Sequence, residues 1–167
     1  MIDIMYHRGP DGNGMHLYDN CVLGHNRLSI VDLSTGNQPM LDDTGKICIV
    51  FNGEIYGYKE LRKQLDYPFK TTSDTELIIA MYKKYGVGLL DKLPGMFAFA
   101  IWDDEKQQFF AARDRFGEKP FYYTVKNDEL VFASEIKAIH ASGIGDKKVN
   151  YQALSKYLNY GYTGPKM

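Results

Sequence analysis

The longest run of apolar residues in this chain reads MFAFAIW and spans residues 96–102. A shorter run, ICIVF, spans residues 47–51. Polar segments typical of hairpin turns occupy residues 103–106 and 126–129, which predicts antiparallel strands. A strand with one wet face would alternate apolar and polar side chains, and these two runs do not. Both of their faces must therefore be covered, which predicts an α+β fold with two mainly antiparallel sheets stacked between helical layers.

The remaining elements follow from local patterns. Residues 1–6 resemble the last turns of an amphipathic helix. Ser73 and Glu76 have the spacing of a capping box at the start of the clearest helix, and Gly86 is a suitable stop. Further β-like segments span residues 15–18, 21–27, 108–112, 120–125 and 130–133, and further helical segments span residues 56–65, 135–140 and 151–160.

Bulk composition excludes several classes of function. A length of 167 residues suits one domain, and 20 Lys+Arg against 21 Asp+Glu give a net charge of −1. This balance offers no electrostatic case for binding nucleic acid or an anionic membrane, and no apolar run is long enough to span a bilayer. Cys21 and Cys48 lie in apolar, strand-like stretches, so we expect free buried thiols and a cytoplasmic location.

A few polar residues stand where a purely structural role would be costly. Arg27 ends an apolar strand and must find an anion, either a substrate carboxylate or a neighbouring acid. Asn52 and Gly53 follow a buried strand and could supply two convergent hydrogen-bond donors, although Asn-Gly is more often a turn. Glu54 directly behind them is costly unless it serves a cation.

Asp74 and His25 each have a structural interpretation as well. Asp74 lies in the first turn of the helix that begins after Ser73, where an acid complements the helix dipole by about 0.3–1 kcal/mol. It could bind a ligand at the same time. His25 is better interpreted as a hydrogen-bonded structural histidine than as a catalytic base.

Four blocks of sequence identify a family. HRGPDG at residues 7–12, GHNRLSIVD at 24–32, FNGEIY at 51–56 and SDTE at 73–76 resemble the glutamine amidotransferase domain of glutamine-hydrolysing asparagine synthetases. The resemblance runs from residue 7 to residue 161. It implies the four-layer αββα sandwich of N-terminal-nucleophile hydrolases. It also implies hydrolysis of glutamine to glutamate and ammonia, with ATP-dependent amidation of aspartate in a synthetase domain.

The resemblance also implies roles for individual residues. Arg27 would bind the α-carboxylate of glutamine, and the backbone at Ile30 and Val31 would lie along the substrate. Asn52 and Gly53 would form the oxyanion hole. The substrate ammonium would be held by Glu54 and Asp74. Arg8 would brace the site.

The nucleophile of this family is a Cys directly behind the initiator Met, freed to become the N-terminal residue. No Cys stands near the N-terminus here, and neither Cys21 nor Cys48 has a neighbour that would lower its pKa. We therefore expect residues 1–167 to form one amidotransferase domain that is truncated at its N-terminus and ends before a synthetase domain. We expect this chain to be catalytically incomplete.

The resemblance implies L-glutamine and the synthetase domain as partners. It implies no cofactor in this domain, with ATP and Mg²⁺ needed only in the synthetase domain. Two other functions stay open: a non-catalytic binding module of the same fold, and a relative that amidates another acceptor. Loss of a strand would expose a sheet edge, so we also expect either a homodimer across that edge or movement of residues 1–6 into the gap.

Overall fold

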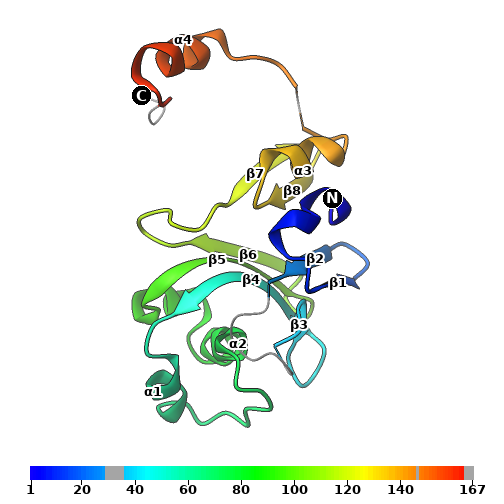
Figure 1. Ribbon diagram of the computed structural model, residues 1–167. Coiled ribbons are helices and arrows are strands. Elements are labelled where there is room, and N and C mark those ends of the chain that lie inside the picture. Colours follow the sequence, from blue (N-terminus) through cyan, green and yellow to red (C-terminus); the bar gives the residue numbers. More distant parts are fainter. Residues whose placement is uncertain (29–35, 146, 164–167) are drawn as a thin grey trace.

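The computed structural model describes residues 1–28, 36–145 and 147–163 (Figure 1). Its central sheet has four antiparallel strands in the order β3 (Met40–Leu41), β4 (Ile47–Ile55), β5 (Gly95–Asp103) and β6 (Gln108–Arg113). β4 and β5 pair along their whole length. The two apolar runs therefore lie side by side in the middle of the sheet.

Each face of the central sheet is covered by a different layer. Ile49, Phe51 and Ile101 belong to a core cluster shared with helix α2 (Asp74–Tyr85). The alternate residues Val50 and Ala100 belong to a second cluster on the opposite face. Burial of the two runs on both faces is confirmed, because residues 47–51 and 97–102 are all buried and only Met96 is partly exposed.

The layer on that opposite face consists of two separate two-stranded sheets. β1 (Gly12–Leu17) pairs with β2 (Val22–Arg27), and β7 (Tyr122–Lys126) pairs with β8 (Glu129–Ala133). The sequence analysis predicted one second sheet instead. The second layer divides because, within the described ranges, no strand pairs with both β2 and β8.

An outer layer of helices completes the sandwich. The 3₁₀ helix η1 (Asp3–Arg8) contacts β2, and α3 (Ile136–Ala141) contacts β7, β8 and η1. α2 covers the far face of the central sheet, with α1 (Tyr58–Lys63) packed beside it (Figure 1). The predicted order of layers, αββα, is therefore confirmed.

The ends of α2 agree only in part with the capping box and the glycine stop that the sequence predicted. The Ser73 hydroxyl accepts a hydrogen bond from the backbone N–H of Thr75, and Gly86 ends the helix with a positive φ. Glu76 does not complete the predicted capping box. Its carboxylate instead accepts hydrogen bonds from the backbone N–H groups of Lys70 and Thr71, because the loop before the helix folds back over it. A 3₁₀ helix, η2 (Gly86–Lys92), follows α2 and was not predicted.

The C-terminal helix stands apart from the sandwich. α4 (Tyr151–Tyr160) has the predicted bounds and is capped by the Asn150 side chain, but none of its residues is buried. In Figure 1 it lies at the end of an extended link, away from the sheets. Among the helices that the structure describes, none is long and apolar enough to cross a membrane.

Candidate active site

A polar pocket of about 330 Å³ lies where the end of β2, the second half of β4 and the first turn of α2 meet. Its lining contains every predicted site residue that the structure describes. These are Arg8, Arg27, Asn52, Gly53, Glu54 and Asp74. The predicted residues Ile30 and Val31 lie outside the described residues. Arg27 at the end of β2 and the acids Glu54 of β4 and Asp74 of α2 therefore converge on one cavity.

Asn52, Gly53 and Glu54 lie inside β4 rather than behind its end. They pair with Ala98, Phe97 and Met96 of β5, so the Asn-Gly dipeptide is not a turn, and the predicted strand end at residue 51 is wrong. A Cβ on Gly53 would lie 2.2 Å from the carbonyl oxygen of Met96. Only glycine therefore allows β4 and β5 to approach this closely.

The backbone N–H of Gly53 is directed toward the pocket. Alternate residues of a strand direct their N–H and C=O groups to the same edge. On the outer edge of β4, the N–H of Phe51 donates to the Gln38 side chain (2.6 Å) and the N–H of Ile55 donates to the Asp74 carboxylate (3.1 Å). Phe97 is the β5 residue opposite Gly53. Its N–H donates to the Asp114 carboxylate, and its carbonyl oxygen accepts from the backbone N–H of Asp114. The Gly53 N–H, between two occupied donors, therefore faces the cavity.

Gln38 was missed by the sequence analysis. Its side-chain oxygen accepts from the N–H of Phe51, and its side-chain nitrogen donates to the Phe51 carbonyl (3.0 Å). The pairing of β3 with β4 ends at Met40 and Ile49, so the Gln38 amide continues that ladder by one step. The spacing of apolar residues along the sequence could not reveal this role, because Gln38 lies in a loop and its partner Phe51 lies in a strand.

Asp74 is the first residue of α2 and is buried, with 4% of its surface exposed. Burial raises the pKa of its carboxyl group, and the nearby Glu54 carboxylate raises it further, whereas the N–H of Ile55 lowers it. The proposed dipole role at the helix start and a ligand role are compatible in this geometry. The two acids form a negative wall at one side of the polar pocket.

Arg27 and Arg8 are each held by a side chain that the sequence did not reveal. The Arg27 guanidinium donates to the Asn37 side-chain oxygen (2.9 Å). Arg8 donates to Glu135 (3.4 Å), whose carboxylate also contacts His7 (2.8 Å). The hydrogen bond from His7, followed by that from Lys137, lowers the pKa of Glu135 to about 2. Residues from η1 and the start of α3 thus form one ionic cluster beside the pocket.

His25 was predicted to be a hydrogen-bonded structural residue, and in the structure only one of its two ring nitrogens has a partner. Its Nε2 lies 3.1 Å from the Phe51 carbonyl oxygen, so Nε2 carries the proton and Nδ1 is an acceptor. That Nδ1 is buried and has no partner among the described residues. Burial lowers the pKa of His25 to about 4. The imidazole is therefore neutral at pH 7, with one unused acceptor.

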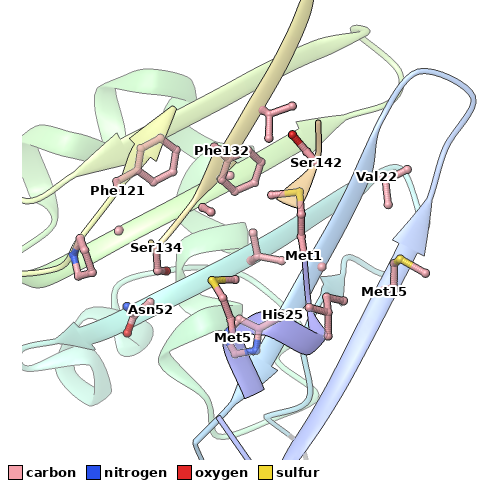
Figure 2. A pocket seen from close by; sticks show the side chains of 18 of the residues that line it. Met1, Met5, Met15, Val22, His25, Asn52, Phe121, Phe132, Ser134 and Ser142 are labelled. Carbon is pink, nitrogen blue, oxygen red and sulfur yellow. The ribbon is translucent and has the colours of Figure 1, made fainter. Parts of the chain in front are cut away.

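A second, mainly apolar cavity of about 690 Å³ adjoins the polar pocket. His25, Asn52 and Ser134 line both cavities. Figure 2 shows Phe121 and Phe132 in the upper part of the cavity and Asn52 and Ser134 at its left. His25 is seen beside Met5, with Met1 above them. The polar pocket thus opens into an apolar cavity between the two small sheets.

Neither cysteine lines either cavity. Burial raises the pKa of Cys21 to about 11 and that of Cys48 to about 12. Both thiols are free, as the sequence analysis predicted. They are protonated at neutral pH and are unsuited to nucleophilic attack.

The model of the glutamine amidotransferase domain family matches residues 1–166. The chain belongs to this family. Over 157 residues it is 45% identical to "Asparagine synthetase [glutamine-hydrolyzing] 2" of Bacillus subtilis (strain 168), an alignment that covers 93% of this chain and 21% of the relative. Over 148 residues it is 48% identical to "Amidase chry2" of Gibberella zeae, covering 86% of this chain and 22% of that relative. The amidotransferase domain thus spans about a fifth of the length of these two relatives.

Solved structures support the same fold. The domain is similar to glutamine phosphoribosylpyrophosphate amidotransferase from Bacillus subtilis, solved with ADP and GMP, with a TM-score of 0.61 and 27% sequence identity. The match covers 73% of this chain and 29% of that one. The αββα architecture expected from the sequence resemblance is therefore confirmed.

Proposed function

We propose that the polar pocket binds L-glutamine and that this domain is the glutamine-hydrolysing part of a cytoplasmic asparagine synthetase. The ammonia would serve the amidation of aspartate elsewhere in the longer protein, where ATP and Mg²⁺ are used. The observation that carries the proposal is the convergence of Arg27, Glu54, Asp74 and the Gly53 N–H on one cavity. An amino acid with a side-chain amide requires this combination of charges and donors.

The charges of the pocket suit the two ends of an amino acid. The planar guanidinium of Arg27 can donate two parallel hydrogen bonds to an α-carboxylate. Asp74 and Glu54 offer carboxylates to the α-ammonium group. Asp74 is buried and Glu54 beside it is exposed. A buried acid next to a second acid is costly when no cation is present, so a bound ammonium group would stabilise the site. Arg8, held by Glu135, supports the wall beside them.

The donors of the pocket suit the reacting amide. When a nucleophile attacks the side-chain amide of glutamine, negative charge develops on its oxygen. The Gly53 N–H and the Asn52 side-chain amide can stabilise that oxygen, and loss of one such donor typically costs about 10²–10³ in rate. Asn52 and Gly53 are fixed by their ladder partners in β5, so the donors are positioned before substrate binds.

The test compares this 167-residue chain with a longer form that carries an upstream segment beginning with Cys. We expect the longer form to release ammonia from glutamine and the 167-residue chain to release none above background, because Cys21 and Cys48 are protonated core thiols. In the longer form, Arg27→Lys keeps the charge but loses the planar fork, and we expect KM to rise at least tenfold with little change in kcat. Equal ammonia release by both forms would refute the proposal.

A second candidate function differs only in the acceptor of ammonia. The similarity to "Amidase chry2" favours it, since that relative is not called an asparagine synthetase. The full-length protein, supplied with glutamine, ATP and Mg²⁺, would be assayed for asparagine formation from aspartate. Glutamine hydrolysis without asparagine formation would favour another acceptor, and glutamine binding with no hydrolysis by the longer form would favour a binding module.

A further inference from the structure

A short loop before β3 connects two parts of the polar pocket. Asn37 accepts a hydrogen bond from the Arg27 guanidinium (2.9 Å). The next residue, Gln38, bonds both backbone groups of Phe51 in β4 (2.6 and 3.0 Å). Phe51 stands two positions before Gly53 on the same strand. Adjacent loop residues thus contact the proposed carboxylate-binding group and the strand that carries the proposed oxyanion donors.

The side-chain amide of Gln38 has no hydrogen left to offer a ligand. One N–H donates to the carbonyl oxygen of Phe51, and the other donates to the hydroxyl of Thr75 (3.4 Å) in the first turn of α2. The amide oxygen accepts from the N–H of Phe51. Although Gln38 lines the polar pocket, it therefore acts on the positions of β4 and α2 rather than on a ligand directly.

The carbonyl oxygen of Phe51 is held from two directions. Besides the bond from Gln38, it accepts one from Nε2 of His25 (3.1 Å), which belongs to β2. A carbonyl oxygen has two lone pairs, so both are occupied here. β2 ends at Arg27. One backbone group of β4 is therefore tied both to the loop with Gln38 and to the strand that carries Arg27.

β1 packs closely against the backbone of Gln38. A Cβ on Gly14 would lie 2.3 Å from the Gln38 carbonyl oxygen and 3.1 Å from the Pro39 Cδ, so only glycine fits there. Gly14 belongs to β1, whose first residue, Gly12, pairs with Arg27. The hairpin of β1 and β2 lies beside β4 (Figure 1), and β2 contacts β4. Gln38 therefore lies between the hairpin that carries Arg27 and the strand β4, and it limits how closely they approach.

A ligand held at both ends must match the distance between the groups that hold it. Arg27 would bind the α-carboxylate, and the Gly53 N–H would bind the oxygen of the side-chain amide. Glutamine has one methylene group more than asparagine between these ends. Groups on independently mobile elements could adapt to either ligand, but Asn37, Gln38 and His25 restrict such movement. One methylene group in a fitted pocket typically changes discrimination by about 10–200-fold.

We propose that Gln38 is a positioning residue that fixes the separation between Arg27 and the Gly53 N–H, so that the polar pocket selects amino-acid amides by side-chain length. Glutamine spans this separation. Asparagine is too short, and L-homoglutamine, with one further methylene group, is too long. This role of Gln38 rests on the proposed function, which assigns the two ends of the ligand. Gln38 itself contacts neither end and acts through Phe51 and the loop that holds Arg27.

The experiment titrates the 167-residue chain with L-glutamine, L-asparagine and L-homoglutamine by calorimetry. We expect the parent chain to bind glutamine about tenfold or more tightly than the shorter and the longer amide. Gln38→Met keeps the length of the side chain but loses both hydrogen bonds to Phe51. In this variant we expect glutamine to bind about tenfold more weakly and its preference over asparagine to fall to about threefold or less.

Two further variants make the comparison specific. Gln64→Met is the matched control, since Gln64 is exposed at the end of α1 and lines neither cavity. We expect it to keep the parent preference. Asn37→Ala removes the bond to Arg27 without touching β4, and we expect it to lower the preference for glutamine as well. Hydrogen exchange of the Phe51 amide should be faster in Gln38→Met and unchanged in Asn37→Ala, which reports the bond to β4 separately from ligand binding.

The outcomes separate selection by length from the proposed function. Loss of affinity for all three amides by the same factor in Gln38→Met would overturn the selecting role, because Gln38 would then only stabilise the fold. Equal binding of the three amides by the parent chain would overturn it too, while the glutamine site would stand. A parent chain that binds none of them would overturn the proposed function, and selection by length with it. If Gln38→Met does not fold, a reduced preference in Asn37→Ala supports the role and an unchanged one overturns it.

Discussion

The carboxylate of Asp74 accepts the backbone N–H of Ile55 at 3.1 Å, which joins the first turn of α2 to the last residue of β4. β4 also carries Asn52, Gly53 and Glu54. One buried hydrogen bond therefore sets the position of one acid relative to the oxyanion donors and to the other acid. Asp74 is at once a ligand candidate and a structural link.

These two roles of Asp74 can be separated by substitution. Asp74→Asn keeps an oxygen acceptor for Ile55 but removes the charge, so we expect a stability within about 1 kcal/mol of the parent and at least tenfold weaker glutamine binding in the longer form. Asp74→Ala leaves the Ile55 N–H buried and unpaired. This should lower the free energy of unfolding, measured in urea, by about a further 1–3 kcal/mol. Asp91→Asn, at an exposed position, controls for net charge. Unchanged glutamine affinity in Asp74→Asn would exclude Asp74 as a ligand.

Gly53 is expected to tolerate no side chain. Its added Cβ would lie 2.2 Å from the Met96 carbonyl oxygen and 2.8 Å from the Phe97 Cα, and both neighbours are backbone atoms that cannot rotate away. We expect Gly53→Ala to lose about 3 kcal/mol or more of unfolding free energy. Gly57→Ala is the matched control, since Gly57 also has a positive φ but open space around it, and about 1 kcal/mol is expected there. Similar losses in the two variants would contradict the clash.

His25 should make the stability of the protein depend on pH. Its pKa in the folded state is lowered to about 4, against an ordinary value of 6.5, so between these pH values the unfolded chain binds a proton that the folded chain does not. Stability is therefore lost as pH falls through this window, by about 2 kcal/mol from pH 7 to pH 5. Urea unfolding at both pH values should show this loss largely removed in His25→Gln. His16→Gln should retain it, and an equal pH dependence in all three proteins would show that His25 is not responsible.

The two cysteines should react slowly with alkylating agents. Burial raises the pKa of Cys21 to about 11 and that of Cys48 to about 12, so at pH 8 only a very small fraction of either is thiolate. We expect iodoacetamide to modify Cys21 about 100-fold more slowly than an unburied cysteine, and Cys48 more slowly still, as followed by mass spectrometry. Both should react at ordinary rates in urea. Rapid modification of folded Cys21 would reopen the question of a substitute nucleophile.

Much of the central sheet could be predicted from local sequence. The runs at residues 47–51 and 96–102 are apolar without alternation, which is a direct consequence of burial on two faces. The start of α2 after Ser73 and its end at Gly86 were predicted because capping depends on residues within one turn. The same local reasoning placed Asn52 and Gly53 behind a strand that ended at residue 51, and that strand end was wrong. Their pairing partners in β5 lie more than forty positions away and outweigh the preference of an Asn-Gly pair for turns.

The sequence by itself determined the layer order, the residue types of the site and the absence of a suitable nucleophile within residues 1–167, because these depend on composition, periodicity and short motifs. Only the tertiary structure decided that Gln38 occupies the Phe51 donor, that Asp74 occupies the Ile55 donor and that the Gly53 N–H between them faces the pocket. It also decided that β2 and β8 face each other across an apolar cavity. The physical reason is that a backbone donor has no side-chain signature, so its partner is set by strand register and by loops that meet in space.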